Sequence, residues 1–186
     1  MPLVRHCPGC GSRVRREVPP GDNRPRAVCP ACSVVHYENP RIVVGAVCHD
    51  GPRLVLCRRA IPPRIGFWTF PAGFMELGET AEEGAAREAF EEAGVHVDID
   101  RLLGVYSVPQ RGQVHLLYEA RMRDARHAAG EESLEVVMRD WEDIPWEDLA
   151  FPSIRWGLEL AFEARQQSLW VPRMTSSSAP AGTDAN

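Results

Sequence analysis

Hydrophobic positions along the chain predict a sheet accompanied by helices. β-branched residues are frequent from Arg41 onward, and after the turn at 50–52 the apolar run Leu54–Cys57 completes a predicted β-hairpin that ends at Pro62-Pro63. Further runs typical of strands lie near 102–108, 114–122 and 134–138. The central and C-terminal parts of the chain therefore predict a mixed α/β domain.

Two helices are expected beside these strands. The pattern between Thr80 and Ala93 is helical, with Thr80 as N-cap, Glu83 three residues later as its capping-box partner and Gly94 at the C-terminal cap. A second helix is predicted to start at Ser153, where apolar residues recur at helical spacing. Residues 174–186 are small and polar, and we expect them to be disordered.

The N-terminal segment is distinguished by two cysteine pairs. Cys7 and Cys10 form one C-x2-C pair, and 18 residues later Cys29 and Cys32 form another. This spacing is typical of a four-thiolate zinc site, whereas a redox dithiol needs one pair only. Structural Zn2+ would join two turns that so short a segment could not hold together with a core of its own.

The other cysteines and two nearby histidines are not predicted to have a catalytic or redox role. Cys48 and Cys57 lie in apolar runs, where a free cysteine usually acts as a small buried hydrophobe. His6 and His36 lie next to the predicted zinc ligands; either could replace one of them, but we interpret both as bystanders.

Length and composition limit the class of protein. The chain has 186 residues, of which 44% are hydrophobic and 25% charged, as expected of one compact domain with a small module. No stretch approaches ~20 consecutive apolar residues and no signal-peptide pattern opens the chain, so we expect a soluble, cytoplasmic protein. All 21 basic residues are Arg, which excludes lysine catalysis.

Charge supports a division into two modules. Residues 1–40 carry a net charge of +3, whereas the remainder carries -8. Four thiolates and one Zn2+ would reduce the N-terminal charge to about +1, which weakens the case for nucleic-acid binding. We expect a zinc ribbon over 1–37, a catalytic domain over 38–173 and a tail over 174–186.

Three carboxylates share one face of the first predicted helix. Glu88, Glu91 and Glu92 stand at positions i, i+3 and i+4, where like charges oppose a helix by roughly 0.2–0.5 kcal/mol per pair. A divalent cation would remove this repulsion, and oxygen ligands favour Mg2+ or Mn2+, often together with substrate phosphates. The alternative is a salt-bridge network in which Arg87 pairs with these carboxylates.

The sequence of this helix and of the loop before it resembles a known family motif. Gly73, Glu79 and the run Arg87–Val95 fit the Nudix box, G-x5-E-x7-R-E-U-x-E-E-x-G-U, at every defined position. The chain thus resembles the Nudix hydrolases. The resemblance implies an α/β/α sandwich around a mixed sheet and magnesium-dependent cleavage of a diphosphate joined to a nucleoside.

The resemblance extends over about residues 7–165. The four-cysteine segment, the run Tyr37–Pro40 and the run Gly66–Gly73 look like the zinc-ribbon Nudix proteins that include FAD and ADP-ribose pyrophosphatases. The SQPWPFPxS signature of the NADH pyrophosphatases is absent, and residues 106–113 stand in its place. FAD or ADP-ribose is therefore the expected substrate, with AMP as a product. Alternatives are an NADH pyrophosphatase, an NTP-sanitising enzyme or a nucleotide-sensing module that binds nucleic acid.

Residue roles follow from the resemblance. It implies magnesium ligands at Glu88, Glu91 and Glu92, a loop glutamate at Glu79 and an orienting arginine at Arg87. The backbone carbonyl of Ala72 or Gly73 is expected to add a ligand. Glu135 resembles the extra downstream glutamate that many members use for metal or base, its alternative being a strand-surface carboxylate. The base stays open among Glu88, Glu92 and Glu135.

Substrate contacts are predicted less directly. Aromatic side chains could stack on an adenine or flavin ring, although aromatics at strand positions usually belong to the core. These candidates are Trp68, Phe70, Phe74, Tyr106 and Tyr118. Arg111 is a loop candidate for binding a phosphate. We expect a nucleotide-type small molecule as the partner, neither membrane nor nucleic acid, and a homodimer is compatible with the sequence.

Overall fold

The computed structural model describes residues 4–177 and divides the chain into two compact units, 1–40 and 41–186. No described helix is long and apolar enough to cross a membrane.

The N-terminal unit is a small antiparallel sheet with two cysteine-bearing turns. Its three strands are β1 (Arg15–Glu17), β2 (Arg26–Val28) and β3 (Val35–His36), in that order. The Gly11 N–H donates to the Cys7 carbonyl at 2.8 Å, and the Ser33 N–H donates to the Cys29 carbonyl at 2.9 Å. Each cysteine pair therefore begins an equivalent tight turn.

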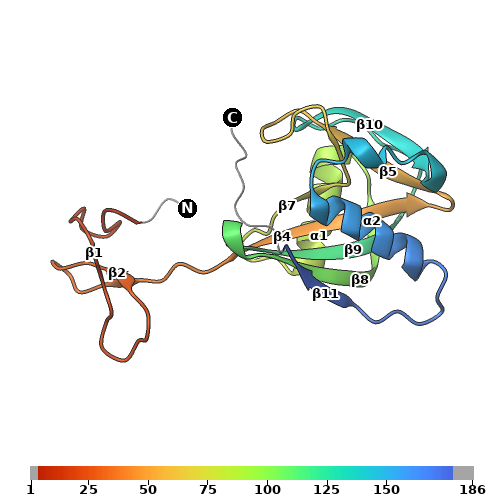
Figure 1. Ribbon diagram of the computed structural model, residues 1–186. Helices are drawn as coiled ribbons and strands as arrows, with labels where there is room; N and C mark the ends of the chain where they lie inside the picture. Colours follow the sequence, from red (N-terminus) through yellow and green to blue (C-terminus); the bar gives the residue numbers. More distant parts are fainter. Residues whose placement is uncertain (1–3, 178–186) are drawn as a thin grey trace. The chain divides into compact units, whose positions relative to one another are not determined.

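The second unit is built on a mixed sheet with the order β10-β5-β4-β9-β8-β11 (Figure 1). β4 pairs with β9 and β8 with β11 in parallel, while the other neighbours are antiparallel. Two short strands, β6 and β7, pair with β5 and β4 respectively. The strands are β4 (Arg41–Asp50), β5 (Arg53–Arg59), β6 (Trp68–Thr69), β7 (Ala72–Phe74), β8 (Val97–Val108), β9 (Gln113–Met122), β10 (Ser133–Asp140) and β11 (Arg173–Ser176).

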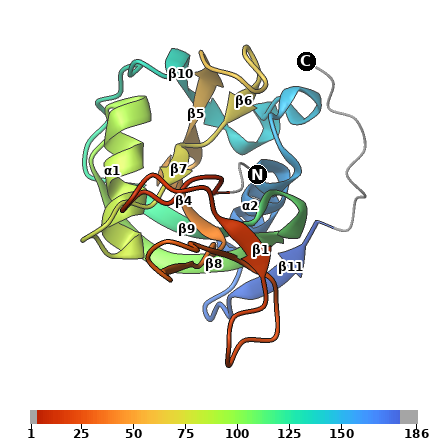
Figure 2. The same ribbon diagram turned by 90° about the vertical axis from the view of Figure 1, so that its left-hand side faces the viewer.

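One helix covers each face of this sheet, as Figure 2 shows. α1 (Ala81–Ala93) packs Ala85 and Ala89 against Val44 and Val55 of the sheet. α2 (Pro152–Ala164) packs on the other face, where Leu158 and its neighbours enclose Phe70. In β4 and β5, alternate residues belong to the two cores, since successive strand side chains point to opposite faces. The expected α/β/α sandwich is confirmed.

The structure differs from the sequence expectations in extent. β8 begins at Val97 rather than near 102, because its first residues pair in register with the end of β9, Val97 with Met122 and Asp98 with Arg121. α2 starts one residue early, at Pro152.

The C-terminal segment also differs from its expectation. Residues 174–176 form most of β11, which pairs in parallel with Gly104–Ser107 of β8, instead of being disordered. Backbone hydrogen bonds along an open sheet edge compensate for a polar sequence with little tendency to form a core. Residues 178–186 of the expected tail lie outside the described part of the chain.

Candidate active site

The helix that carries the glutamates begins and ends as its sequence predicts. The Thr80 side chain accepts from the Glu83 N–H at 3.2 Å, and the Glu83 carboxylate accepts from the Thr80 N–H at 2.8 Å. Gly94 closes the helix in the left-handed region, with φ of 64°. These caps fix where α1 starts, and therefore which of its residues face β7.

Two glycines let glutamates approach the backbone closely. A Cβ at Gly73 of β7 would collide with the Glu88 carboxylate, so only glycine permits Glu88 to lie against this strand. A Cβ at Gly84 would lie 2.6 Å from Glu79 Oε1, so α1 and the preceding loop depend on glycine in the same way. The role of Gly84 was not identified from the sequence.

Arg87 holds three of the predicted carboxylates. Its Nε and Nη2 donate to the two oxygens of Glu79 at 3.0 and 2.9 Å, and its Nη1 donates to Glu88 and Glu91, each at 2.8 Å. Nη2 also donates to the Phe74 carbonyl at 3.0 Å. The bond from Arg87, helped by the Glu76 N–H, lowers the pKa of Glu79 to about 2. In the absence of metal, Glu88 and Glu91 therefore form the salt bridges to Arg87 that the sequence offered as the alternative to a metal site.

Glu92 differs from its neighbours on the helix. It is only 7% exposed, and its Oε2 accepts from the Ala72 N–H at 3.0 Å. Burial raises the pKa of Glu92 to about 7, despite that backbone bond and the partly compensating charge of Arg59. Burial also raises the pKa of Glu88, which is 8% exposed, while Arg87 opposes the shift. Glu92 is therefore a buried carboxylate that would gain from a cation.

The β9–β10 loop brings a glutamate toward these groups that the sequence analysis missed. The Gly130 N–H donates to the Glu92 carbonyl at 3.1 Å, and a Cβ at Gly130 would collide with the Glu91 carbonyl. Two residues later, the Glu132 carbonyl accepts from the Ala60 N–H at 2.8 Å. After burial and closer charges, the charge of Glu132 also raises the pKa of Glu88 and Glu92. The sequence Gly-Glu-Glu at 130–132, between two predicted strands, is the feature from which Glu132 could have been identified as a candidate.

The remaining predicted residues are distributed more widely. Glu135 lies on β10, where its carboxylate is 3.8 Å from Arg58 Nη1. Tyr106 is 8% exposed and packs against Trp156 at 5.4 Å between ring centroids, which leaves little of its ring for a ligand. Trp68 is half-buried under the Arg139 guanidinium, and Arg111 ends the short helix η1 (Pro109–Arg111).

The other aromatic candidates divide between core and surface. Phe70 and Tyr118 are buried, in agreement with the core alternative, whereas Phe74 is partly exposed beneath the Arg41 guanidinium.

The four N-terminal cysteines gather into a cluster. Their sulfurs lie within 4.8 Å of one another, with separations of 3.7 Å for Cys7 to Cys32, 3.4 Å for Cys10 to Cys29 and 3.8 Å for Cys10 to Cys32. A tetrahedral site with zinc–sulfur bonds of about 2.3 Å requires sulfurs about 3.8 Å apart. This cluster therefore fits zinc. Cys48 and Cys57 are buried elsewhere in the sheet, as expected.

The glutamate site fits a harder cation but is not closed around one. Among residues 4–177, the cysteine cluster is the one group of three or more Cys, His, Asp or Glu side chains whose ligand atoms already converge. Arg87 instead holds Glu79, Glu88 and Glu91. A cation joining Glu88 or Glu91 to Glu92 thus requires these carboxylates to turn from Arg87, while the oxygen donor set suits Mg2+ or Mn2+.

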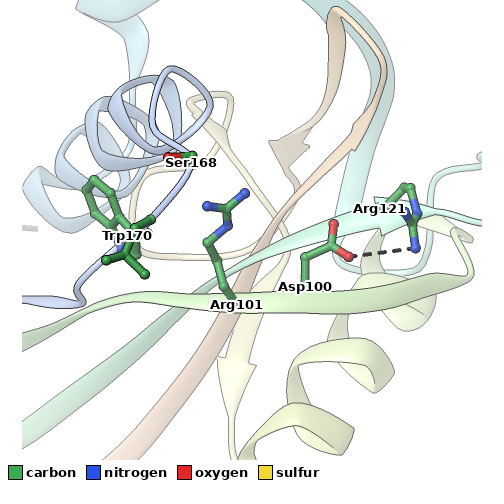
Figure 3. A pocket seen from close by; sticks show the side chains of 6 residues that line it. Asp100, Arg101, Arg121, Ser168 and Trp170 are labelled. Atoms are coloured by element: carbon green, nitrogen blue, oxygen red, sulfur yellow. Dashed lines mark ion pairs between the residues drawn. The ribbon is translucent and has the colours of Figure 1, made fainter.

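A separate cavity of about 510 Å3 lies over β8 and β9 (Figure 3). Its arginines are already paired: Arg121 lies 3.8 Å from Asp100, and Arg101 Nε lies 2.7 Å from the carboxylate of buried Glu119. None of the predicted site residues lines this cavity, which is bounded by Asp100, Arg101, Arg121, Ser168, Leu169 and Trp170.

Comparison with known proteins places this geometry in a family. The family model described as the NUDIX domain matches residues 39–157, and the model described as Nudix N-terminal, a zinc ribbon, matches residues 5–38. The crystal structure of a NUDIX hydrolase from Nitrosomonas europaea superimposes with a TM-score of 0.86 at 40% identity, covering 94% of this chain and 100% of that one.

Curated relatives carry several names. A MutT-like protein of Streptomyces ambofaciens is 43% identical over 42% of this chain and 49% of its own length. An ADP-ribose pyrophosphatase of Methanocaldococcus jannaschii is 30% identical over 59% of this chain and 67% of its own length. An NAD-capped RNA hydrolase, NudC, of Vibrio parahaemolyticus is 36% identical over 54% of this chain and 37% of its own length. The chain thus spans about half or less of the first and third of these relatives.

The intact box on α1, the sandwich around it and the two matching models lead to one conclusion. The chain belongs to the Nudix family, with a Nudix zinc ribbon preceding its Nudix domain.

Proposed function

We propose that the protein hydrolyses the diphosphate bond of a nucleoside diphosphate derivative, with ADP-ribose or FAD as substrate and AMP as a product. The observation that carries this proposal is Glu92, a buried carboxylate beside Glu88 with a pKa of about 7 and no ion pair to Arg87. Burying such a group costs free energy unless a cation or proton compensates it. A bound Mg2+ would supply that compensation.

Each box residue has a distinct task in this proposal. Glu92, Glu88 and Glu91 would hold Mg2+, which would neutralise the charge of the diphosphate and lower the pKa of a water. Arg87 keeps Glu79 fixed through its two-pronged contact, so that the loop before α1 stays in place. Gly73 keeps β7 close enough for Glu88 to lie against its backbone, and the Ala72 carbonyl is a further candidate ligand.

The reaction requires a base as well as ligands. The water oxygen bonds to one phosphorus, the bridging P–O bond breaks, and the water proton passes to a carboxylate. We favour Glu132 over Glu135 for this role, because the charge of Glu132 contributes to raising the pKa of both Glu88 and Glu92, whereas Glu135 lies beside Arg58 on β10. Glu88 and Glu92 remain candidates.

Substrate choice is tested by a product assay. Purified protein with Mg2+ is incubated with ADP-ribose, FAD, NADH and nucleoside triphosphates, and products are separated by chromatography. We expect AMP with ribose 5-phosphate from ADP-ribose, and AMP with FMN from FAD. Much faster hydrolysis of NADH or a triphosphate would refute this substrate choice while leaving diphosphate hydrolysis intact.

A second candidate substrate is an NAD-type dinucleotide. Relatives named NAD-capped RNA hydrolase and NAD(P)H pyrophosphatase match this chain at 27–36% identity, which supports the candidate. The sequence at 106–113 lacks the signature expected of NADH pyrophosphatases, which argues against it. The NADH arm of the same assay decides between them.

For the N-terminal unit we propose one structural zinc ion. The sulfur separations of the four cysteines suit tetrahedral zinc, and the ribbon has few buried apolar residues of its own. Metal analysis of freshly prepared protein should give one zinc per chain, and Cys10→Ser should unfold the ribbon while the Nudix domain keeps its thermal transition. Protein without stoichiometric zinc would contradict this assignment.

A further inference from the structure

The zinc ribbon contains a basic hollow of its own. A cavity of about 300 Å3 lies at the strands and the loop before β2, lined by Arg16, Arg24, Pro25, Arg26, His36 and Glu38. The net charge of the module gives no indication of this concentration, because Arg5, Arg13 and Arg15 lie outside it. Three arginines and one histidine, with one glutamate, therefore line a space at the lower end of the range for ligand pockets.

Strand register explains why these side chains meet. Arg16 of β1 pairs with Ala27 of β2, and Ala27 pairs with His36 of β3. Residues in register on neighbouring antiparallel strands share one face of the sheet. Ala27 between them is fully buried, so Arg16 and His36 line the hollow from the two outer strands.

Two polar groups of the hollow lack a partner. Within residues 4–177, the Arg24 side chain makes no ion pair, whereas Arg26 lies 2.9 Å from Asp22 and Arg16 lies 4.0 Å from Glu38. His36 Nε2 is buried without a hydrogen-bond partner in the described structure. A buried polar nitrogen without a partner is costly, and an acceptor entering the hollow would satisfy it. An anion with several acceptor oxygens would supply a partner to both groups.

We propose that this hollow binds a phosphate group of a single-stranded nucleic acid. Phosphate oxygens accept from Arg16, Arg24 and His36 Nε2, and arginine is suited to phosphate through its planar donors. Tyr37 stands next to His36, is 61% exposed and lies 5.2 Å from the Arg26 guanidinium, so its ring offers a base a stacking surface. Adjacent phosphate and base contacts favour a nucleotide strand over an acidic peptide.

The larger cavity over β8 and β9 lacks these properties. Its Arg101 is engaged by buried Glu119 and its Arg121 faces Asp100, so its cations are compensated within the protein. The ribbon hollow differs because Arg24 is not compensated.

Binding is measured apart from hydrolysis, with the full protein in Mg2+-free buffer. The probe is a fluorescent RNA strand of about ten nucleotides without a cap or diphosphate, followed by anisotropy between about 50 and 200 mM salt. The double variant Arg16→Gln, Arg24→Gln should bind at least about tenfold more weakly. The slope of its binding constant against salt concentration should correspond to about one phosphate contact fewer for each arginine removed.

The matched control is Arg15→Gln. It removes the same charge from the neighbouring position of β1, a residue that does not line the hollow, and should change affinity by no more than about twofold. Zinc content is measured for each variant to show that the ribbon is folded. Equal weakening by Arg15→Gln, or no weakening by the double variant, would overturn the site.

Competition identifies the source of the phosphate. If AMP or inorganic phosphate displaces the RNA at the same concentration as an unlabelled strand, the proposal of a nucleic-acid strand is overturned. Displacement by a polyglutamate peptide at matched charge would overturn it in favour of an acidic partner. Amide shifts in the unaltered protein provide an independent readout: added RNA should shift Arg16, Arg24 and His36, and shifts confined to the Nudix domain would contradict the proposal.

Discussion

Two buried glutamates of the Nudix domain have opposite surroundings. Glu119 on β9 is 2% exposed, and Arg101 Nε lies 2.7 Å from its carboxylate, with His49 Nε2 at 3.6 Å from its other oxygen. Glu92 on α1 is almost as buried, but its carboxylate accepts from the backbone N–H of Ala72, and its pKa rises to about 7. The first carboxylate is compensated within the fold, whereas the second is left for a ligand.

The comparison of Glu119 with Glu92 distinguishes a buried carboxylate that stabilises the fold from one that is available to bind a ligand. A buried carboxylate that has a cationic partner contributes to the packed structure, because removal of either member leaves a charge uncompensated. A buried carboxylate without such a partner lowers stability until a proton or metal compensates it. Both kinds of carboxylate occur on α1, because Arg87 forms ion pairs with Glu88 and Glu91 but not with Glu92.

The largest expected effect is on turnover. Glu92→Gln keeps the shape of the side chain but removes the charge that Mg2+ needs, so kcat should fall at least about 100-fold. Glu119→Gln should leave kcat within about threefold in protein that remains folded. Steady-state kinetics with ADP-ribose measures both, and equal losses in the two variants would abolish the distinction.

Stability should respond in the reverse order. Glu119→Gln leaves Arg101 without its buried partner and should lower the free energy of unfolding by about 1–3 kcal/mol, a range reduced because Arg101 is partly solvated. Glu92→Gln should leave Mg2+-free protein at least as stable as the parent. Urea denaturation without Mg2+ tests this, and a marked destabilisation by Glu92→Gln alone would assign Glu92 to the structural class.

The two downstream glutamates offer a smaller and sharper comparison. Glu132→Gln should lower kcat about 10- to 30-fold if Glu132 accepts the proton or supports the metal, since general-base contributions begin near 100-fold and neighbouring carboxylates can substitute in part. Glu135→Gln, which removes a half-exposed partner of Arg58, should stay within about twofold. A pH–rate profile distinguishes a base from a positioning residue, because loss of the base removes the acidic limb. A larger loss of kcat in Glu135→Gln than in Glu132→Gln would favour Glu135 as the base or metal-supporting residue.

The smallest effect concerns pH. Glu92 has an ordinary pKa of 4.5 and a folded value of about 7, so the native state binds its proton more tightly than the unfolded state. Its contribution to the stability of Mg2+-free protein is fully present below about pH 4.5 and is lost as pH rises through about 7. Melting across this range should show a decline that Glu92→Gln removes and that saturating Mg2+ offsets.

Local features of the fold and site were predictable from sequence. The capping box, the αL glycine and the spacing from Gly73 to Val95 all lie within one stretch of chain, so the dihedral preferences of neighbouring residues determine α1. The cysteine pairs are equally local, because each occupies one turn and the ribbon holds both turns together. The box therefore identified the family before any contact was known.

Contacts between distant segments required the tertiary structure. Sequence spacing placed Glu88, Glu91 and Glu92 on one face, but only packing against β7 buried Glu92 and left Glu91 exposed beside Arg87. The approach of the Gly130 loop to α1 added Glu132 to the candidates that the sequence had left open, Glu88, Glu92 and Glu135, and strand register brought Arg16 and His36 to one hollow. Periodicity specifies the direction of a side chain from its own element, whereas burial and charge compensation depend on which other elements pack against it.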